Sequence, residues 1–393
     1  MTDVAALLSG PEFHVDPYPA YDVLRDLDRV LWVDGMDRWL VTGHAEAVAL
    51  FTHPCASSNR DLADESERWP EDGIQPRGLP FLDPPDHTRL RRLVQGAFTQ
   101  RAVERARPRI EEVVDGLLTA AGERGEFDLV QDFAAPLPAI VLSNLLGIPP
   151  ADHAMYHRWV ATIIETIDPV SHRRRSEAGA DERVTMRNYL TEVIDRRRVE
   201  PRDDLISAMV QAEEDGEQLS SQEILEMCVV LTMAGLEATT SLIANGTIAL
   251  FDHPEQLARL RDDPGLMTSA IEELLRFDAP VQVAGRVARD DFSLGGHELK
   301  KGQTVGVLLG AVNRDPLAFD QPNELRLDRN PNNHLGFGRG IHKCIGAPLA
   351  RLEGPIAFTA LLSRFPGLRL DGEGKRRHNI HVRGFESLPV AVA

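Results

Sequence analysis

The sequence is short of cysteine, and it lacks a hydrophobic run long enough to cross a membrane. Its three cysteines, Cys55, Cys228 and Cys344, form no C-x-x-C pair and show no zinc-ligand spacing. An odd number of cysteines, in a chain whose start carries no secretory signal, argues against a disulfide framework. The longest strongly apolar stretch, Met227–Leu236, is far below the ~20 residues that span a bilayer. These absences predict a soluble, cytoplasmic protein.

Positive charge is the second shortage. The chain has 43 Lys and Arg residues against 61 Asp and Glu residues, which gives a formal net charge of −18. A nucleic-acid binder needs a basic face to neutralise phosphates, so the charge argues against that class. Two basic clusters occur, at Arg173–Arg175 and Arg196–Arg198, and the acidic residues around them favour an interpretation as solvated helix ends.

What is present is an ordinary globular composition, with 42% hydrophobic and 26% charged residues. No repeat, low-complexity tract or linker divides it, so we expect residues 1–393 to form one domain. Two parts are rich in strand signals: residues 28–45, with a hairpin around Asp34-Gly35, and residues 281–310. Helical patterns dominate elsewhere. The sequence predicts a mainly α fold with a smaller β portion, large enough to enclose a cofactor.

The clearest helix is predicted between Ser220 and Asp252. Ser220 and Glu223 have capping-box spacing, and no proline follows before Pro254. The middle of this helix, Cys228–Leu236, is apolar nearly all round, so we expect it to run through the interior.

A glycine-rich segment before the last long helix carries the strongest chemical signal. It reads Phe337-Gly338-Arg339-Gly340-Ile341-His342-Lys343-Cys344-Ile345-Gly346. Glycines allow a close approach and backbone torsions that side chains would block. A helix start offers unpaired N–H groups and a positive dipole end, which lower a thiol pKa. The pattern predicts a single soft anionic ligand, Cys344, pressed against one face of a flat cofactor. Cys55 and Cys228 are interpreted as small hydrophobic residues.

This segment resembles, at each defining position, the F-G-x-G-x-H-x-C-x-G haem-ligand signature of the cytochrome P450 superfamily. Other marks of that family occur in its order along the chain. Glu273-Leu274-Leu275-Arg276 resembles the E-x-x-R motif, and Asn313-Arg314-Asp315-Pro316, with Phe319 and Pro322, resembles the meander. His87-Thr88-Arg89-Leu90-Arg91 resembles the bacterial segment that pairs with haem propionates. The resemblance covers nearly the whole chain and implies the P450 fold, with a long central helix over the haem.

The resemblance implies a haem b cofactor with Cys344 as the axial thiolate and metal ligand, which favours cleavage of the O–O bond of dioxygen. It implies that cationic or hydrogen-bonding side chains bind the propionates, with surface salt bridges as the alternative. It also implies that Phe337 lies near the sulfur. The residues expected to bind the cofactor are His87, Arg91, Ala234, Gly235, Arg286, Phe337, Gly338, His342, Cys344 and Gly346.

The long helix resembles the family's A-G-x-(D/E)-T segment, which carries an acid–alcohol pair for proton delivery. Glu237 keeps the acid, but Ala238 stands where the family has threonine. Thr239 lies one residue further, where a 100° rotation points it elsewhere. Thr239 could act if the helix is locally distorted, a substrate hydroxyl or ordered water could complete the chain, or the reaction tolerates poor proton delivery. We favour substrate or water assistance, with Cys344, Glu237, Ala238 and Thr239 as the catalytic candidates.

Two further sets of residues are expected to form a structural ionic network and to contact the substrate. Glu273 and Arg276 share one helix face, and the resemblance implies a buried structural network with the meander through Arg329. The expected substrate contacts are mainly apolar, which indicates a lipophilic ligand of moderate size, although any core has such residues. They are Val230, Val283, Ala284 and Ile380.

We therefore expect a soluble bacterial-type haem-thiolate monooxygenase. It would insert one oxygen atom from O2 into a C–H bond of an apolar small molecule. The resemblance extends to bacterial members that also lack the alcohol, including a macrolide-ring hydroxylase, which favours a natural-product intermediate of secondary metabolism. Electrons would come from a ferredoxin and its NAD(P)H-dependent reductase, with Arg339 and Lys343 meeting the acidic ferredoxin. We expect a monomer that binds neither nucleic acid nor membrane.

Alternative functions stay open at this point. The same fold could catalyse oxidative coupling, epoxidation, dealkylation or peroxide-driven oxidation, which product analysis with and without a reductase would separate. A haem-based sensor without turnover belongs to another class, and the retention of Glu237 argues against it because a sensor needs no proton delivery. A metal-free structural protein would not need a cysteine in that glycine loop.

Overall fold

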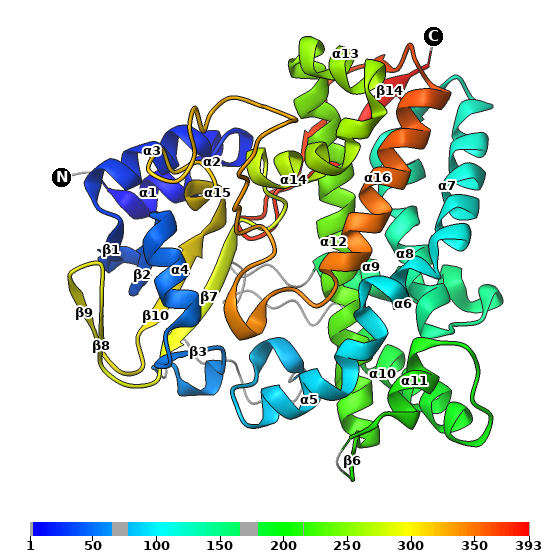
Figure 1. Ribbon diagram of the computed structural model, residues 1–393, viewed down its shortest axis with the longest axis horizontal. Helices are drawn as coiled ribbons and strands as arrows, with labels where there is room; N and C mark the ends of the chain where they lie inside the picture. The colour runs from blue at the N-terminus through cyan, green and yellow to red at the C-terminus, as the bar shows by residue number, and fades with distance from the viewer. Residues whose placement is uncertain (1–2, 65–77, 166–179, 215, 393) are drawn as a thin grey trace.

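A larger helical region stands beside a smaller region that holds the N-terminal helices and the main sheet (Figure 1). The computed structural model describes residues 3–64, 78–165, 180–214 and 216–392. The predicted fold class, mainly α with a smaller β portion, is confirmed. The helices of the larger region are α5 (Asp86–Gln95), α6 (Gln100–Glu104), α7 (Arg107–Gly122), α8 (Pro136–Leu146), α9 (His153–Glu165), α10 (Ala180–Val199), α11 (Leu205–Gln211), α12 (Ser221–Asp252), α13 (Pro254–Asp262), α14 (Met267–Phe277) and α16 (Ala347–Arg364).

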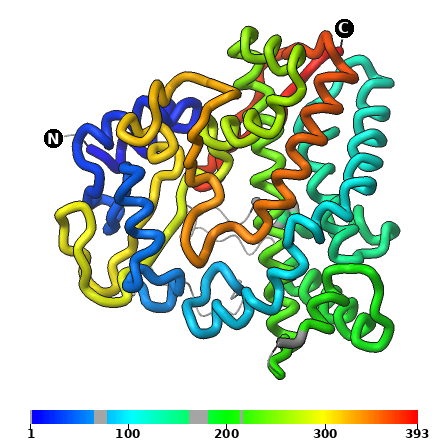
Figure 2. The backbone as a smooth tube through the Cα atoms, viewed as in Figure 1, coloured from blue at the N-terminus to red at the C-terminus, as the bar shows by residue number. Residues whose placement is uncertain are grey.

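The helix α12 is the centre of the larger region. Its predicted capping box is present: the Ser220 hydroxyl accepts from the Glu223 N–H, and the Glu223 carboxylate accepts from the Ser220 N–H. The helix packs against α8, α10, α14 and α16, and Figure 2 shows its path alongside α16. By length and composition α12 could cross a membrane, but 67% of its most apolar window is buried inside the protein. Its apolar surface therefore serves the core.

The smaller region is built on a five-stranded sheet in the order β1-β2-β10-β7-β3. The predicted hairpin is confirmed, with β1 (Val30–Val33) antiparallel to β2 (Arg38–Val41). The strand β10 (Thr304–Leu308) runs parallel to β2 and antiparallel to β7 (Val283–Ala288), which also pairs with β3 (Ala56–Ser57). Both predicted strand-rich parts thus meet in one sheet. The helices of this region are α1 (Val4–Ser9), α2 (Pro11–Val15), α3 (Tyr18–Leu27), α4 (His44–Thr52) and α15 (Leu309–Val312).

Short strands join distant parts of the chain. The strand β14 (Pro389–Ala391) pairs with β4 (Glu126–Asp128) and with β11 (Arg369–Leu370). The turn between β12 (Lys375–Arg376) and β13 (Phe385–Ser387) reaches the segment just before β7, where Val382 bridges to Val281. The remaining pairs are β12 (Lys375–Arg376) with β13 (Phe385–Ser387), β5 (Glu213–Glu214) with β6 (Glu217–Gln218), and β8 (Phe292–Leu294) with β9 (His297–Leu299).

The interpretation of Arg196–Arg198 as a solvated helix end is wrong for Arg197. This residue is buried at the end of α10, where it donates to the Asp204 carboxylate and, over 2.8 Å, to the Gly147 carbonyl. A buried guanidinium needs such partners, so Arg197 joins α10 to the turns that flank α8 and α11. The other basic cluster, Arg173–Arg175, lies outside the described residues.

Candidate active site

The ligand loop, residues 337–346, connects the meander to α16. Its ends are held together because the Cys344 N–H donates to the Phe337 carbonyl over 2.9 Å. Gly340 has φ +72°, and a Cβ there would lie 2.5 Å from the Phe51 carbonyl oxygen at the end of α4. Only glycine fits this position, so the loop packs directly on the smaller region. Gly338 also has a positive φ, +65°.

Cys344 lies just before the first turn of α16. Its sulfur accepts hydrogen bonds from the N–H groups of Gly346 and Ala347, and the charges of Arg91 and Arg351 also favour the thiolate. Burial outweighs these effects, and the pKa of the Cys344 thiol is raised. The N–H groups at the helix start act to lower this pKa, as predicted, but they do not overcome the effect of burial. Protein surrounds the residue on most sides, yet Cys344, unlike Cys228, keeps an exposed surface. A group can therefore reach its sulfur.

The middle of α12 is open where the sequence pattern predicts burial. Residues 224–232 and 239–247 are buried, but Ala234 and Gly235 between them are exposed. The expectation that all of Cys228–Leu236 packs in the interior is therefore wrong beyond Thr232. Small residues that stay exposed within a core helix leave a space beside it, and such a space suits a flat group.

Four predicted cofactor residues, two arginines and two histidines, form a cluster that carries the positive charge of Arg91 and Arg286. The rings of His87 and His342 lie 4.2 Å apart between centroids. Arg91 donates over 2.7 Å to the carbonyl of Lys343, next to the ligand cysteine. Burial lowers the pKa of Arg286 to about 10, and burial with the Arg286 charge lowers the pKa of His342 to about 3. These shifts indicate too few anions around the cluster, although Asp83 acts on it from nearby.

The cluster fits an anionic cofactor. Among the residues that the structure describes, no hydrogen-bond partner reaches the buried ring nitrogens of His87 or the buried Nδ1 of His342. Within the described part of the chain, Arg91 and Arg286 donate to backbone carbonyls, of Lys343 and Gly285, and neither forms an ion pair. Unpaired buried polar groups are costly, and two carboxylates such as haem propionates would supply the missing acceptors. With the open cysteine and the exposed small residues of α12, these side chains suit haem.

The acid and alcohol candidates on α12 face different partners. Glu237 forms an ion pair with Arg377, which begins the turn between β12 and β13. Ala238 is half-buried, and Thr239 is buried and donates over 3.3 Å to the carboxyl of Glu353 on α16. The helix is regular α throughout, so the distortion that would redirect Thr239 is absent.

Glu353 is a candidate that sequence reasoning missed. It is 2% exposed, and burial raises its pKa to about 8, opposed only by the Thr239 hydrogen bond. A carboxyl that stays protonated at neutral pH inside the core is uncommon outside functional sites. The available signal was a lone acid between Leu352 and Gly354, on the helix that follows Cys344.

The raised pKa of Glu353 predicts a pH-dependent effect on stability. The folded state holds the proton up to about pH 8, whereas the unfolded chain releases it near the ordinary value of 4.5. Stability from this group is therefore complete below pH 4.5 and is lost as the pH rises to 8. We expect Glu353→Gln to raise the midpoint of thermal unfolding more at pH 8 than at pH 5. The exposed Glu373→Gln serves as the control and should show no such trend.

The predicted substrate contacts fall into two groups. Val230 is buried, and a Cβ on Gly78 would lie 2.9 Å from its Cγ2, so the chain at residue 78 covers it. Val283, Ala284 and Ile380 are half-buried, and the first two begin the strand β7. Val283 and Ile380 pack on the same apolar cluster.

The expected ionic network with the meander is confirmed. Glu273 and Arg276 are fully buried and form two hydrogen bonds, of 2.7 and 2.8 Å. Arg329 donates to both oxygens of Glu273, over 3.0 and 3.1 Å. Arg276 also donates to the carbonyls of Asn313 and Pro322. The network fixes the meander that leads into the ligand loop.

Comparisons with known proteins agree with this geometry. The family model described as Cytochrome P450 matches residues 126–264 and 265–381. 6-Deoxyerythronolide B hydroxylase of Saccharopolyspora erythraea is 39% identical over 98% of each chain. The solved structure of the bacillaene polyketide synthase cytochrome P450 PksS from Bacillus subtilis 168 has a TM-score of 0.90 at 36% identity and covers 98% of this chain and 99% of its own. P450BioI, solved with a hexadec-9Z-enoic acid ligated acyl carrier protein, also has a TM-score of 0.90 at 36% identity, over 97% of this chain and 100% of its own. The chain therefore belongs to the cytochrome P450 family and is a haem-thiolate monooxygenase.

Proposed function

We propose that this protein inserts one oxygen atom from O2 into a C–H bond of a lipophilic natural-product intermediate, with Cys344 as the thiolate that would hold the haem iron. The observation that carries the proposal is the open cysteine at the start of α16, together with the buried imidazole nitrogens of His87 and His342 that lack a partner among the described residues. When bound, haem supplies the activation of dioxygen. Everything else in the reaction depends on how the chain positions the cofactor, the substrate and the protons.

We assign cofactor binding to the cluster of two arginines and two histidines, to α12 and to the ligand loop. His87, Arg91, Arg286 and His342 bind the propionates, and the charge of Arg91 lies close enough to Cys344 to favour its thiolate as well. Ala234 and Gly235 leave the room for the ring because they carry almost no side chain. Phe337, Gly338 and Gly346 shape the loop. The guanidinium of Arg351 lies over the aromatic ring of Phe337, 4.5 Å from the ring centroid.

Proton handling is assigned to Thr239 and Glu353 rather than to a threonine at position 238. The Glu353 carboxyl is protonated at neutral pH and accepts a hydrogen bond from the Thr239 hydroxyl. The pair therefore holds a proton on Glu353, at the contact between α12 and α16. Glu237 keeps its position through Arg377, at the substrate side of the helix. Ordered water or a substrate hydroxyl then extends the route past the methyl group of Ala238.

The names of the relatives support the proposed substrate class, and the exposed face of the ligand loop supports the proposed partner class. One relative is named a 6-deoxyerythronolide B hydroxylase, which supports a polyketide-like substrate here, in contact with Val283, Ala284 and Ile380. We assign electron supply to a ferredoxin and its NAD(P)H-dependent reductase. Arg339, Ile341 and Lys343 are exposed on the ligand loop and present an apolar centre with positive flanks to an acidic protein. We further propose a cytoplasmic monomer.

The test follows the oxygen atom. The haem-loaded protein, a surrogate ferredoxin and its reductase would be incubated with NADPH under ¹⁸O₂. The substrate would be the macrolactone that gives the largest high-spin shift. We expect one ¹⁸O atom in the product and none from labelled water. Product that forms equally well from hydrogen peroxide without a reductase would instead assign peroxide-driven chemistry.

The same assay tests the proton route. We expect Glu353→Gln and Thr239→Val to lower product formation about 10²-fold, the range of general acid catalysis, with the electrons diverted to hydrogen peroxide. Thr239→Ser keeps the hydroxyl and should retain most of the activity. Haem content and the carbon monoxide spectrum should stay unchanged in all three variants. Unchanged coupling in Glu353→Gln would contradict the assignment of this pair.

A further inference from the structure

The hairpin of β12 and β13 lies along one face of the central helix α12. It meets that helix at Glu237, Ser241 and Asn245, which are spaced four residues apart. Residues at that spacing stand one above the other on a helix, and α12 is regular α throughout. The hairpin is therefore fastened along a single stripe of α12, and that stripe includes the acid Glu237.

The contacts at Ser241 and Asn245 are close and buried. A Cβ on Gly384 would lie 3.2 Å from the Cβ of Ser241, so the backbone of the hairpin rests directly on α12 there. Asn245 donates Nδ2 to the Arg383 carbonyl over 2.9 Å and accepts over 3.1 Å from Nη1 of Arg376. Ser241 and Asn245 are both buried, so these contacts are shielded from water and fix the hairpin on the helix.

The turn of the hairpin, residues 377–384, is fixed on its other side as well. The Arg383 N–H donates over 2.8 Å to the Pro280 carbonyl, and the Gln282 N–H donates over 2.7 Å to the His381 carbonyl. The turn thus connects α12 with the segment that leads into β7, and backbone hydrogen bonds hold it in place.

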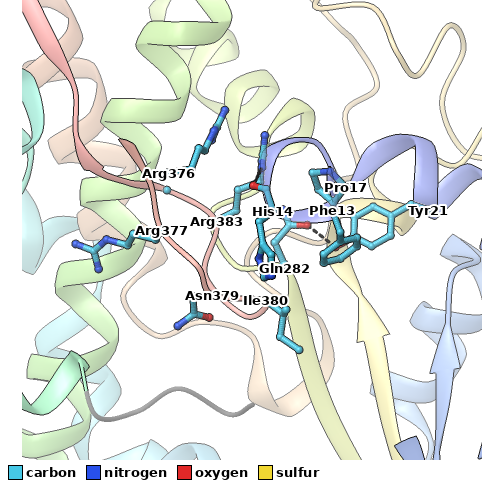
Figure 3. Close-up of a pocket in the computed structure, with 11 residues that line it drawn as sticks. Phe13, His14, Pro17, Tyr21, Gln282, Arg376, Arg377, Asn379, Ile380 and Arg383 are labelled. Carbon is cyan, nitrogen blue, oxygen red and sulfur yellow. Dashed lines mark hydrogen bonds between the residues drawn. The ribbon is translucent and has the colours of Figure 1, made fainter. Parts of the chain in front are cut away.

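Arg377 extends from this fixed turn to α12. Its backbone N–H donates to the Gly384 carbonyl and its Nε to the Phe385 carbonyl, each over 3.2 Å. Its Nη1 donates to the Glu237 carboxylate, with which it forms an ion pair. In Figure 3, which draws a pocket beside the turn, the Arg377 side chain points toward α12 and away from Phe13. The guanidinium is therefore held in position for the acid.

Glu237 stands beside the open part of α12. Its side chain is 16% exposed, and the neighbouring Ala234 and Gly235 are exposed as well. A glutamate side chain has several torsions and loses much conformational freedom when it is held in one rotamer. An ion pair with a guanidinium that is itself bound to the backbone supplies this order, because the planar fork of Arg377 has a fixed direction.

The missing hydroxyl at position 238 makes this order important for the reaction. Ala238 cannot hydrogen-bond the water that extends the proton route. The neighbouring Glu237 carboxylate can accept from such a water, so its position determines where the water is held.

We propose that Arg377 is a positioning residue of the oxygenation reaction, which holds the carboxylate of Glu237 at the substrate side of α12 through their ion pair. The inference rests on the proposed function, because it concerns the protons of the same reaction. It deepens that function by assigning control of the acid to the hairpin of β12 and β13.

The test removes the guanidinium and keeps most of the length of the side chain. In Arg377→Met we expect about tenfold less product per NADPH consumed, the usual effect of losing a charge-assisted hydrogen bond, with the missing electrons recovered as hydrogen peroxide. KM, the haem content and the carbon monoxide spectrum should stay at their wild-type values, because the Arg377 side chain points toward α12. Arg377→Lys keeps the charge and should recover most of the product yield. The substrate and the ferredoxin system are those of the ¹⁸O₂ experiment.

A double variant shows whether Arg377 acts through the acid. Glu237→Gln should lower the product yield by at least about tenfold, and adding Arg377→Met to it should lower the yield no further, because the two side chains act as one unit. A wild-type yield in Arg377→Met would overturn the proposal. So would a double variant in which the second substitution causes its full loss again.

Lys375→Gln is the matched control. It removes one positive charge from the same hairpin, where Lys375 is exposed and pairs with Glu386 on β13, and it should leave the yield unchanged. An equal loss in this control would show that any charge on the hairpin has the same effect, and would contradict the proposal.

A crystal structure of Arg377→Met gives a measurement that does not depend on turnover. The Glu237 carboxylate should leave its wild-type position, while the contacts at Ser241 and Asn245 remain. A carboxylate that stays in place would overturn the proposal. The absence of ¹⁸O from the product of the wild-type protein would instead contradict the proposed function, so the two failures are distinct.

Discussion

Cys344→Ser is expected to abolish the absorption band that carbon monoxide gives with reduced, thiolate-ligated haem, and oxygenation with it. A serine hydroxyl is not ionised at neutral pH and is a poor ligand for a soft site. The loop itself should persist, because the backbone bond from residue 344 to the Phe337 carbonyl does not involve the side chain. The measurements are the carbon monoxide difference spectrum, the haem content and the rate of product formation.

Cys55→Ser is the matched control for this experiment. Cys55 is half-buried and packs against the apolar cluster around the main sheet. Its variant should show the wild-type band and activity. A thiolate band that survives in Cys344→Ser would assign the ligand to Cys55 or Cys228 and contradict the proposed site.

Glu273→Gln is expected to destabilise the protein by about 3–5 kcal/mol, the usual cost of leaving a buried charge without its partner. The carboxylate accepts from Arg276, from Arg329 and from the N–H of Arg326, over 2.9 Å in the last case. A neutral amide would leave two guanidinium groups uncompensated and turn one N–H group toward them. The shift would be read as a lower midpoint of chemical unfolding of the haem-loaded protein, together with lower haem retention.

Glu324→Gln provides the comparison within the same meander. The side chain of Glu324 is exposed and, among the described residues, accepts a hydrogen bond only from Gln321, so its replacement should change stability by no more than about 0.5 kcal/mol. An equally small effect of Glu273→Gln would show that the meander is held by backbone contacts alone.

The sequence was sufficient for features that depend on neighbouring residues. The segment from Phe337 to Gly346 concentrates its glycines, histidine and cysteine in ten positions, so its shape and chemistry can be predicted together. The cap of α12 and the hairpin of β1 and β2 are equally local, and both are confirmed. The E-x-x-R network involves distant segments, and only the family resemblance made Arg329 predictable as its third member.

Partners that depend on the packing of distant segments were not predictable. Nothing near Thr239 in the sequence indicates Glu353, because their contact exists only where α12 crosses α16. The burial of Arg197 likewise depends on Asp204, across the turn after α10. The openness of Ala234 and Gly235 could not be read from hydrophobicity either, since apolar residues beside a cofactor and apolar residues in a core give the same pattern.

The sheet pairings between the two ends of the chain determine when the protein can fold. The strand β2 pairs with β10, and β4 pairs with β14. In each pair the earlier strand can form its interstrand hydrogen bonds only after the later strand has been synthesised. His87 likewise leaves the ribosome long before His342, whose ring it contacts. Contacts of such long sequence separation slow folding, because the loop entropy is lost before the contacts form. The residues that would hold the haem are therefore brought together only after the late segment with His342 and Cys344 has been synthesised.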